Sequence, residues 1–198
     1  MIIVISPEKT IKNEINHVKT MLDHGLDLFH FRKYGMEKDD AINYLAQFNL
    51  HYFDRIVLHT HHYLIEHFSI NRLHFNSMAR VNNEYKGHIE QYALSTSTHS
   101  ISEFNNMGSE WDYAFISPLF PSISKPGYGN QSHLMEQLIS ISNKDVRAVG
   151  LGGIHKDNIA TVLQNNLSVA LMGSIWSQSN PSDYFLSCKK SADCLYKI

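Results

Sequence analysis

Short apolar runs alternate with longer amphipathic stretches along the whole chain. Residues 146–150 and 168–172 are apolar at most positions, which is typical of parallel strands that are covered on both faces. The pattern predicts strands at 2–5, 26–31, 55–59, 72–75, 92–95, 111–116, 146–150 and 168–172. It predicts helices at 11–24, 38–49, 61–68, 102–107, 134–142, 156–165 and 183–196, and no helix directly after residue 75.

This alternation predicts an α/β fold over residues 1–198, a single-domain (β/α)8 or TIM barrel. An open, doubly wound sheet is the alternative. The turn after Ile5 reads Ser-Pro-Glu-Lys, however, and lacks the Gly-x-Gly-x-x-Gly pattern of dinucleotide-binding sheets. In a barrel, the loops that follow the carboxyl ends of the strands carry the chemistry, so candidate residues are sought there.

The charge balance narrows the class of ligand. With Lys+Arg 17, Asp+Glu 19 and a pI near 6.7, the chain has no basic field that would recruit nucleic acid or an anionic membrane. The apolar start at residues 1–5 is too short for a signal peptide or a membrane span. The two cysteines lie six positions apart in the last predicted helix. We therefore expect a cytoplasmic protein with a small-molecule ligand; the oligomeric state, including a homo-oligomer, stays open.

Three segments, at 117–125, 150–154 and 171–175, each follow a predicted strand and resemble phosphate-binding turns. Glycine lets backbone N–H groups approach an anion closely, and a following helix adds the positive end of its dipole. The pairs Gly152-Gly153 and Gly173-Ser174 end the last two predicted strands, where such barrels commonly hold phosphate. The loop 120–131, rich in Ser, Gly and Pro, is expected to act as a lid that presents Ser122, Ser124 and Lys125 to a phosphorylated ligand.

Basic and imidazole side chains follow several other strands. Alternation places His30 and Arg32 on one strand face, where both suit phosphate oxygens, although a rim salt bridge is an equal interpretation for Arg32. A zinc site among His59, His61 and His62 lacks a defined ligand framework, so no metal site is expected. The residues expected to be catalytic are Arg32, Ser97, His99 and Lys125, and those expected to bind substrate or phosphate are His30, Lys33, His59, His74, Ser122, Ser124, Gly152, Gly153, Gly173 and Ser174.

The loop Ser117-Pro-Leu-Phe-Pro-Ser-x-Ser-Lys125 resembles the Gly-Pro-Ile-Phe-Pro-Thr-x-Thr-Lys loop of thiamine phosphate synthases. In the same order along the chain, further resemblances to that family come from Phe29-His-Phe-Arg-Lys33, Leu73-His-Phe75, Ser97-Thr-His99 and Val149-Gly-Leu-Gly-Gly-Ile154. The resemblance, which extends to the thiazole tautomerases of the same superfamily, implies a transferase of thiamine biosynthesis. In that reaction hydroxymethylpyrimidine diphosphate ionises, the nitrogen of thiazole phosphate attacks the carbocation, and pyrophosphate leaves with the help of Mg²⁺.

Several positions depart from that family. The Asn-Asp pair that binds metal and pyrophosphate reads here as His59-Thr60, the second metal Asp falls at or near Ala79, and the lysine position after strand two is Tyr34. Imidazole is a poor substitute for the carboxylates that Mg²⁺ prefers, so no cofactor is firmly implied. A metal-independent isomerase of the tautomerase kind is one alternative, although the histidine of its sixth loop is Pro118 here. A non-catalytic binder of thiazole phosphate or thiamine phosphate is the other.

Overall fold

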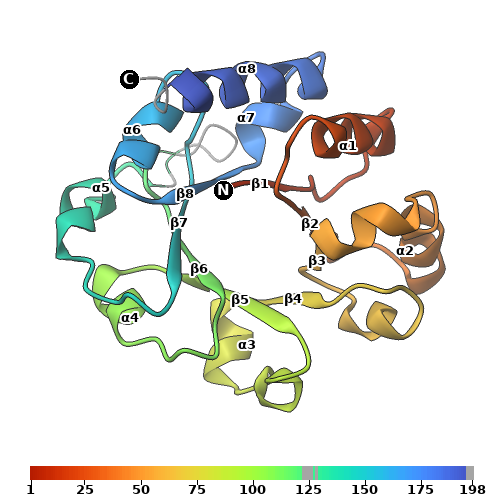
Figure 1. Cartoon of the computed structure of the whole chain (residues 1–198), viewed down its shortest axis with the longest axis horizontal. Helices are drawn as coiled ribbons and strands as arrows, with labels where there is room; N and C mark the ends of the chain where they lie inside the picture. The colour runs from red at the N-terminus through yellow and green to blue at the C-terminus, as the bar shows by residue number, and fades with distance from the viewer. Residues whose placement is uncertain (122–126, 128, 195–198) are drawn as a thin grey trace.

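The computed structural model describes residues 1–121, 127 and 129–194. Eight parallel strands close into a barrel in chain order, and the last strand pairs with the first (Figure 1). The strands are β1 (Ile2–Ile5), β2 (Leu28–Phe31), β3 (Ile56–Leu58), β4 (Arg72–Phe75), β5 (Ala93–Thr98), β6 (Tyr113–Ile116), β7 (Arg147–Leu151) and β8 (Ser168–Leu171). The expected (β/α)8 barrel is therefore confirmed, and the open sheet is not.

Helices surround the barrel as an outer ring (Figure 1). The α-helices are α1 (Glu14–Asp23), α2 (Lys38–Leu45), α3 (Ser77–Val81), α4 (Ile101–Asn105), α5 (Leu134–Gln137), α6 (Ile159–Gln164), α7 (Gly173–Trp176) and α8 (Pro181–Asp193), and short 3-10 helices are η1 (Leu50–Arg55), η2 (His62–Glu66), η3 (Lys86–His88) and η4 (Leu138–Ser140). None of the helices in the described part of the chain is long and apolar enough to cross a membrane.

Two helix predictions need correction. The stretch predicted at 61–68 forms only the 3-10 helix η2, and the segment after β4, where no helix was expected, forms α3. The side chain of Asn76 caps α3 by accepting a hydrogen bond of 2.9 Å from the N–H of Ala79, which stabilises even this short helix. The predicted last residues of the final helix, 195 and 196, lie outside the described residues.

The inside of the barrel combines an apolar cluster with a few buried polar residues. Because side chains alternate along a strand, every second residue points into the barrel. The apolar cluster is Ile3, Ile5, Leu28, Val57, Tyr113, Phe115, Val149 and Ala170, and a second, larger core packs the helices onto the outside of the strands. Three buried polar residues also point inward: His30 of β2, His74 of β4 and Ser95 of β5.

Candidate active site

A cavity of about 550 Å³ lies at the carboxyl ends of the strands, within the size range of small-molecule sites. Eight of the residues proposed from the sequence line it: Arg32, His59, Ser97, His99, Gly152, Gly153, Gly173 and Ser174. His30 and His74 are fully buried deeper in the barrel, and Lys33 points elsewhere. Ser122, Ser124 and Lys125 lie outside the described residues, so the expected lid contacts stay predictions.

The turn after β7 is built for a close approach of backbone to ligand. Gly152 and Gly153 have φ angles of 100° and 63°, which favour glycine. The carbonyl of Gly152 accepts a hydrogen bond of 3.1 Å from the N–H of Phe120, and that of Gly153 accepts one of 3.0 Å from the Asn158 side chain. These bonds hold the two glycines in one conformation at the edge of the cavity.

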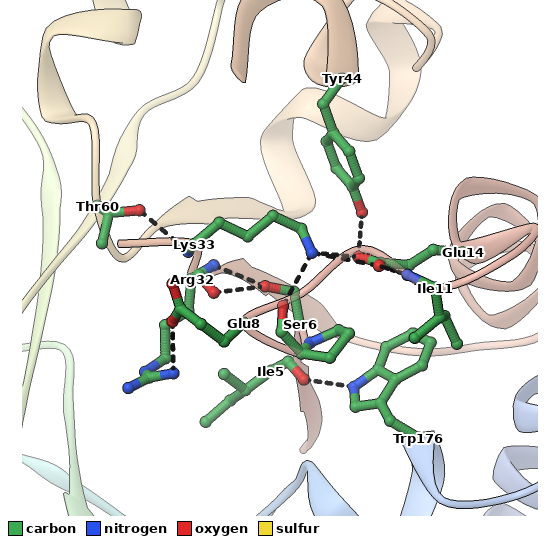
Figure 2. A network of polar contacts seen from close by, with 11 residues as sticks. Ile5, Ser6, Glu8, Ile11, Glu14, Arg32, Lys33, Tyr44, Thr60 and Trp176 are labelled. Atoms are coloured by element: carbon green, nitrogen blue, oxygen red, sulfur yellow. Dashed lines mark hydrogen bonds and ion pairs between the residues drawn. The ribbon is translucent and has the colours of Figure 1, made fainter. Parts of the chain in front are cut away.

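The start of α7 forms the other half of this small-residue rim. The first N–H groups of a helix have no acceptor within the helix, so those of Gly173 and Ser174 suit an anionic oxygen. The Ser174 hydroxyl is buried and has no hydrogen-bond partner among the described residues. Trp176, on the same helix, donates from Nε1 to the Ile5 carbonyl at 2.6 Å and ties α7 to β1 (Figure 2). We call Gly152, Gly153, Gly173 and Ser174 the small-residue cup.

Arg32 fits both interpretations of its sequence position. It lines the cavity, and its Nη1 lies 3.2 Å from Oε2 of Glu8 (Figure 2). Its guanidinium carbon also lies 4.8 Å from the centre of the Tyr34 ring. The Arg32 side chain keeps an exposed fraction of 27%, so it is not fully enclosed by these two neighbours. Glu8 and Tyr34 also line the cavity and were not predicted. Glu8 lies in the loop after β1, and Tyr34 stands where the family has a lysine.

Lys33 was expected to bind a ligand, but its side chain is buried in the core and does not line the cavity. Its Nζ lies 3.0 Å from Oε1 of Glu14 and donates a hydrogen bond of 2.8 Å to the Pro7 carbonyl. Glu14 also accepts from the Tyr44 hydroxyl at 2.7 Å and the Ile11 N–H at 3.0 Å. Figure 2 shows Arg32 and Lys33 leaving the chain in different directions. Burial lowers the pKa of Lys33 while Glu14 opposes that shift, so Lys33 is a structural ion-pair partner in the core.

Three histidines form a cluster beneath the cavity. His30 and His74 are fully buried and His59 is half-buried, and the His59 and His74 rings lie 3.9 Å apart between centres. Burial lowers the pKa of His30 to about 3, with a smaller contribution from Arg72. Burial also holds the pKa values of His59 and His74 well below the usual range, and neighbouring imidazoles add to this. The three rings are therefore neutral at neutral pH.

Ser97 and His99 are held in place by backbone contacts and by a partly exposed ion pair. His99 Nδ1 lies 3.0 Å from the carbonyl oxygen of Ser117, and its N–H donates to Glu103 at 2.7 Å. Arg80 pairs with Glu103 and donates a hydrogen bond of 3.3 Å to the Ser97 carbonyl. This network fixes the end of β5 at the rim of the cavity. Arg80 and Glu103 were not among the residues predicted from the sequence.

The cavity does not fit Mg²⁺. Within the described ranges, Glu8 is the one carboxylate that lines it, and this group is paired with Arg32. The Thr60 hydroxyl accepts from the N–H of Lys33 at 3.3 Å, and Ala79 offers no side-chain oxygen. Mg²⁺ binds oxygen ligands in near-ideal octahedral geometry and usually needs one or two carboxylates. The residues present do not provide such a set.

Comparisons with known proteins agree with the fold. A family model described as thiamine monophosphate synthase matches residues 1–175. A thiamine phosphate pyrophosphorylase from Bacteroides thetaiotaomicron is 27% identical with a TM-score of 0.76, and the match covers 97% of each chain. One from Pyrococcus furiosus is 17% identical with a TM-score of 0.77, covering 98% of this chain and 96% of that chain, and it supports the fold alone. No curated protein matches.

Proposed function

The chain belongs to the thiamine monophosphate synthase family, and we propose that it joins hydroxymethylpyrimidine diphosphate to thiazole phosphate, releasing pyrophosphate. One observation carries the proposal: the small-residue cup and Arg32 line the same cavity. Such a cavity offers two separate places for phosphorylated groups, as a reaction between two phosphorylated substrates requires. Backbone N–H groups and a guanidinium are both suited to phosphate oxygens.

In this proposal the cup holds the phosphate of the thiazole and Arg32 faces the diphosphate of the pyrimidine. The bond between the pyrimidine methylene carbon and the diphosphate oxygen breaks, and its electron pair leaves with pyrophosphate. The thiazole nitrogen then gives its lone pair to the methylene carbocation and forms the new C–N bond. Arg32 stabilises the charge that grows on the leaving oxygen. Lys125, which the sequence predicts to face a phosphorylated ligand, would add a second cation.

The test is to mix the purified protein with both phosphorylated precursors and to measure thiamine phosphate and pyrophosphate. Equal amounts of the two products, formed only with both precursors present, support the synthase. The lack of carboxylates around the cavity, apart from Glu8 among the described residues, favours one second candidate, the metal-independent isomerase. That enzyme would convert thiazole carboxylate phosphate without any pyrimidine. Binding of thiazole phosphate without turnover of either kind would indicate the non-catalytic binder.

We expect turnover to change less than about twofold when Mg²⁺ is withheld, because the cavity lacks the carboxylates that Mg²⁺ requires. Rates are compared in buffer treated to remove Mg²⁺ and in the same buffer with Mg²⁺ restored. Inorganic pyrophosphatase is left out of the assay because it needs Mg²⁺ itself. Turnover that vanishes without Mg²⁺ and returns when it is added would show that other residues bind the ion.

Ser174→Ala is expected to raise the KM for thiazole phosphate about tenfold with little change in kcat. A hydrogen bond to a charged group contributes about 1.5–3 kcal/mol, and a phosphate held equally in ground and transition states affects KM alone. Steady-state kinetics measure both constants. The neighbouring Ser177→Ala, whose side chain is outside the cavity, is the matched control. Gly153 is unsuitable, because an added Cβ would lie 2.3 Å from the Pro121 carbonyl oxygen and disturb the fold.

A further inference from the structure

The histidine cluster has the spacing of a metal site. His30 from β2, His59 just after β3 and His74 from β4 each offer a ring nitrogen, and these atoms all lie within 4.8 Å of one another. His61 and His62, the neighbours considered in the sequence, face backbone carbonyls instead, at 2.8 Å from Lys33 and 3.0 Å from His74. The barrel therefore brings His59 together with His30 and His74, and not with its sequence neighbours His61 and His62.

Two of the three rings are oriented from behind by hydroxyl groups. The Tyr113 hydroxyl lies 2.6 Å from Nε2 of His30, and the Ser95 hydroxyl lies 3.0 Å from Nδ1 of His74. Metal-binding histidines almost always engage their second nitrogen in this way, which fixes the tautomer and aims the first nitrogen at the ion. The nitrogens on the other side of these two rings are Nδ1 of His30 and Nε2 of His74. Nε2 of His74 lies 3.2 Å from the Ser97 hydroxyl, a contact that an ion would replace.

The contact between His30 and His59 is better explained by a shared ion than by a hydrogen bond. Their Nδ1 atoms lie 3.4 Å apart, which is long for a hydrogen bond. Two nitrogens that each lie about 2.0–2.1 Å from a tetrahedral zinc ion are about 3.4 Å apart. No other partner for the His59 ring nitrogens occurs in residues 1–121, 127 or 129–194.

We propose that His30, His59 and His74 bind one divalent transition-metal ion such as Zn²⁺ or Co²⁺, with a coordination position open to the cavity. Imidazole suits these ions, whereas Mg²⁺ prefers carboxylate oxygen. His59 lines the cavity while Tyr113 and Ser95 back the other two rings, so the open position faces the ligand. Three neutral imidazoles leave the ion its full charge, which suits water or an anionic oxygen. The site goes beyond the proposed reaction, because the ion binds without either substrate.

The test is to titrate metal-free protein with Zn²⁺ by calorimetry and with Co²⁺ by visible absorption. We expect one ion per chain, a tetrahedral Co²⁺ spectrum, and no displacement by millimolar Mg²⁺. His59→Ala should weaken Zn²⁺ binding at least 100-fold. Tyr113→Phe, which keeps the ring and removes the hydroxyl behind His30, should weaken it about 10–100-fold. His61→Asn, at a backbone φ of 57° that asparagine tolerates, should bind like the parent.

Thermal unfolding separates loss of the site from loss of the fold. Zn²⁺ should raise the Tm of the parent and of His61→Asn, because an ion that binds only the native state stabilises it. It should leave the Tm of metal-free His59→Ala unchanged. Because His59 is half-buried while His30 and His74 are buried, replacing His59 disturbs the fold least of the three. The proposal is overturned if the folded parent binds no ion, if His59→Ala binds as tightly as the parent, or if Mg²⁺ displaces Co²⁺. Since no substrate is present, these results are independent of the proposed reaction.

Discussion

Replacing Glu14 with alanine is expected to lower the free energy of unfolding by about 3–5 kcal/mol, because a buried charge loses its partner. Lys33 and Glu14 both have side chains that are 0% exposed, and their charged atoms lie 3.0 Å apart. Without the carboxylate, the Lys33 ammonium must stay in the core uncompensated or give up its proton. A typical domain has only about 5–15 kcal/mol of stability, so this change alone removes a large part of it.

Urea unfolding followed by circular dichroism measures this loss. The matched control is Asp193→Ala, which breaks the exposed pair between Lys189 and Asp193 and should cost less than about 1 kcal/mol. Combining Lys33→Met with Glu14→Leu should recover part of the stability, because apolar side chains of similar size remove both buried charges together. The recovery is incomplete because the Tyr44 hydroxyl and the Ile11 N–H lose their acceptor. A Glu14→Ala variant as stable as the parent would mean that Lys33 is not confined to the core.

Replacing Arg32 with lysine is expected to lower kcat/KM for the proposed coupling by about 10²–10³-fold. An ammonium cannot reproduce the two parallel hydrogen bonds of a guanidinium with phosphate, and losing one transition-state donor commonly has an effect of this size. The Tm should change little, because the Arg32 side chain is partly exposed and its ion pair with Glu8 lies at the rim.

Steady-state kinetics with both precursors check this expectation. Arg147→Lys makes the same substitution at the amino end of β7, near Met1 and away from the cavity, and should leave kcat/KM unchanged. If Arg32→Lys turns over like the parent, the diphosphate is bound elsewhere. The family would then account for the fold and not for this site.

Much of the barrel is readable from the sequence, because buried parallel strands leave apolar runs whose ends are marked by polar loops. The strand predicted at 72–75 coincides with β4, and the cup follows from small residues at the ends of β7 and β8. Lys33 shows the limit of this reasoning. Neighbouring residues point in opposite directions, so Arg32 and Lys33 could not both face the cavity, and only the geometry identified Glu14 as the partner of Lys33.

The histidine cluster was not predictable by spacing along the chain. Its members come from β2, from β4 and from the position just after β3, and their proximity depends on the register in which His30 pairs with Val57 and Leu58 pairs with Leu73. A shift of one residue in either pairing would turn an imidazole to the outside. The sequence shows many histidines, but without the register it favours His61 and His62, which are adjacent to His59 and face elsewhere.

The bond from Trp176 to the Ile5 carbonyl gives the protein an internal optical reporter. The chain has two tryptophans, and Trp176 stands two positions after Ser174, with its indole N–H held between α7 and β1. Trp111 is buried before β6, at the opposite end of the barrel. A ligand in the cup would therefore alter the surroundings of Trp176 and leave those of Trp111 unchanged. The emission of a Trp111→Phe variant, which comes from Trp176 alone, would then follow ligand binding directly.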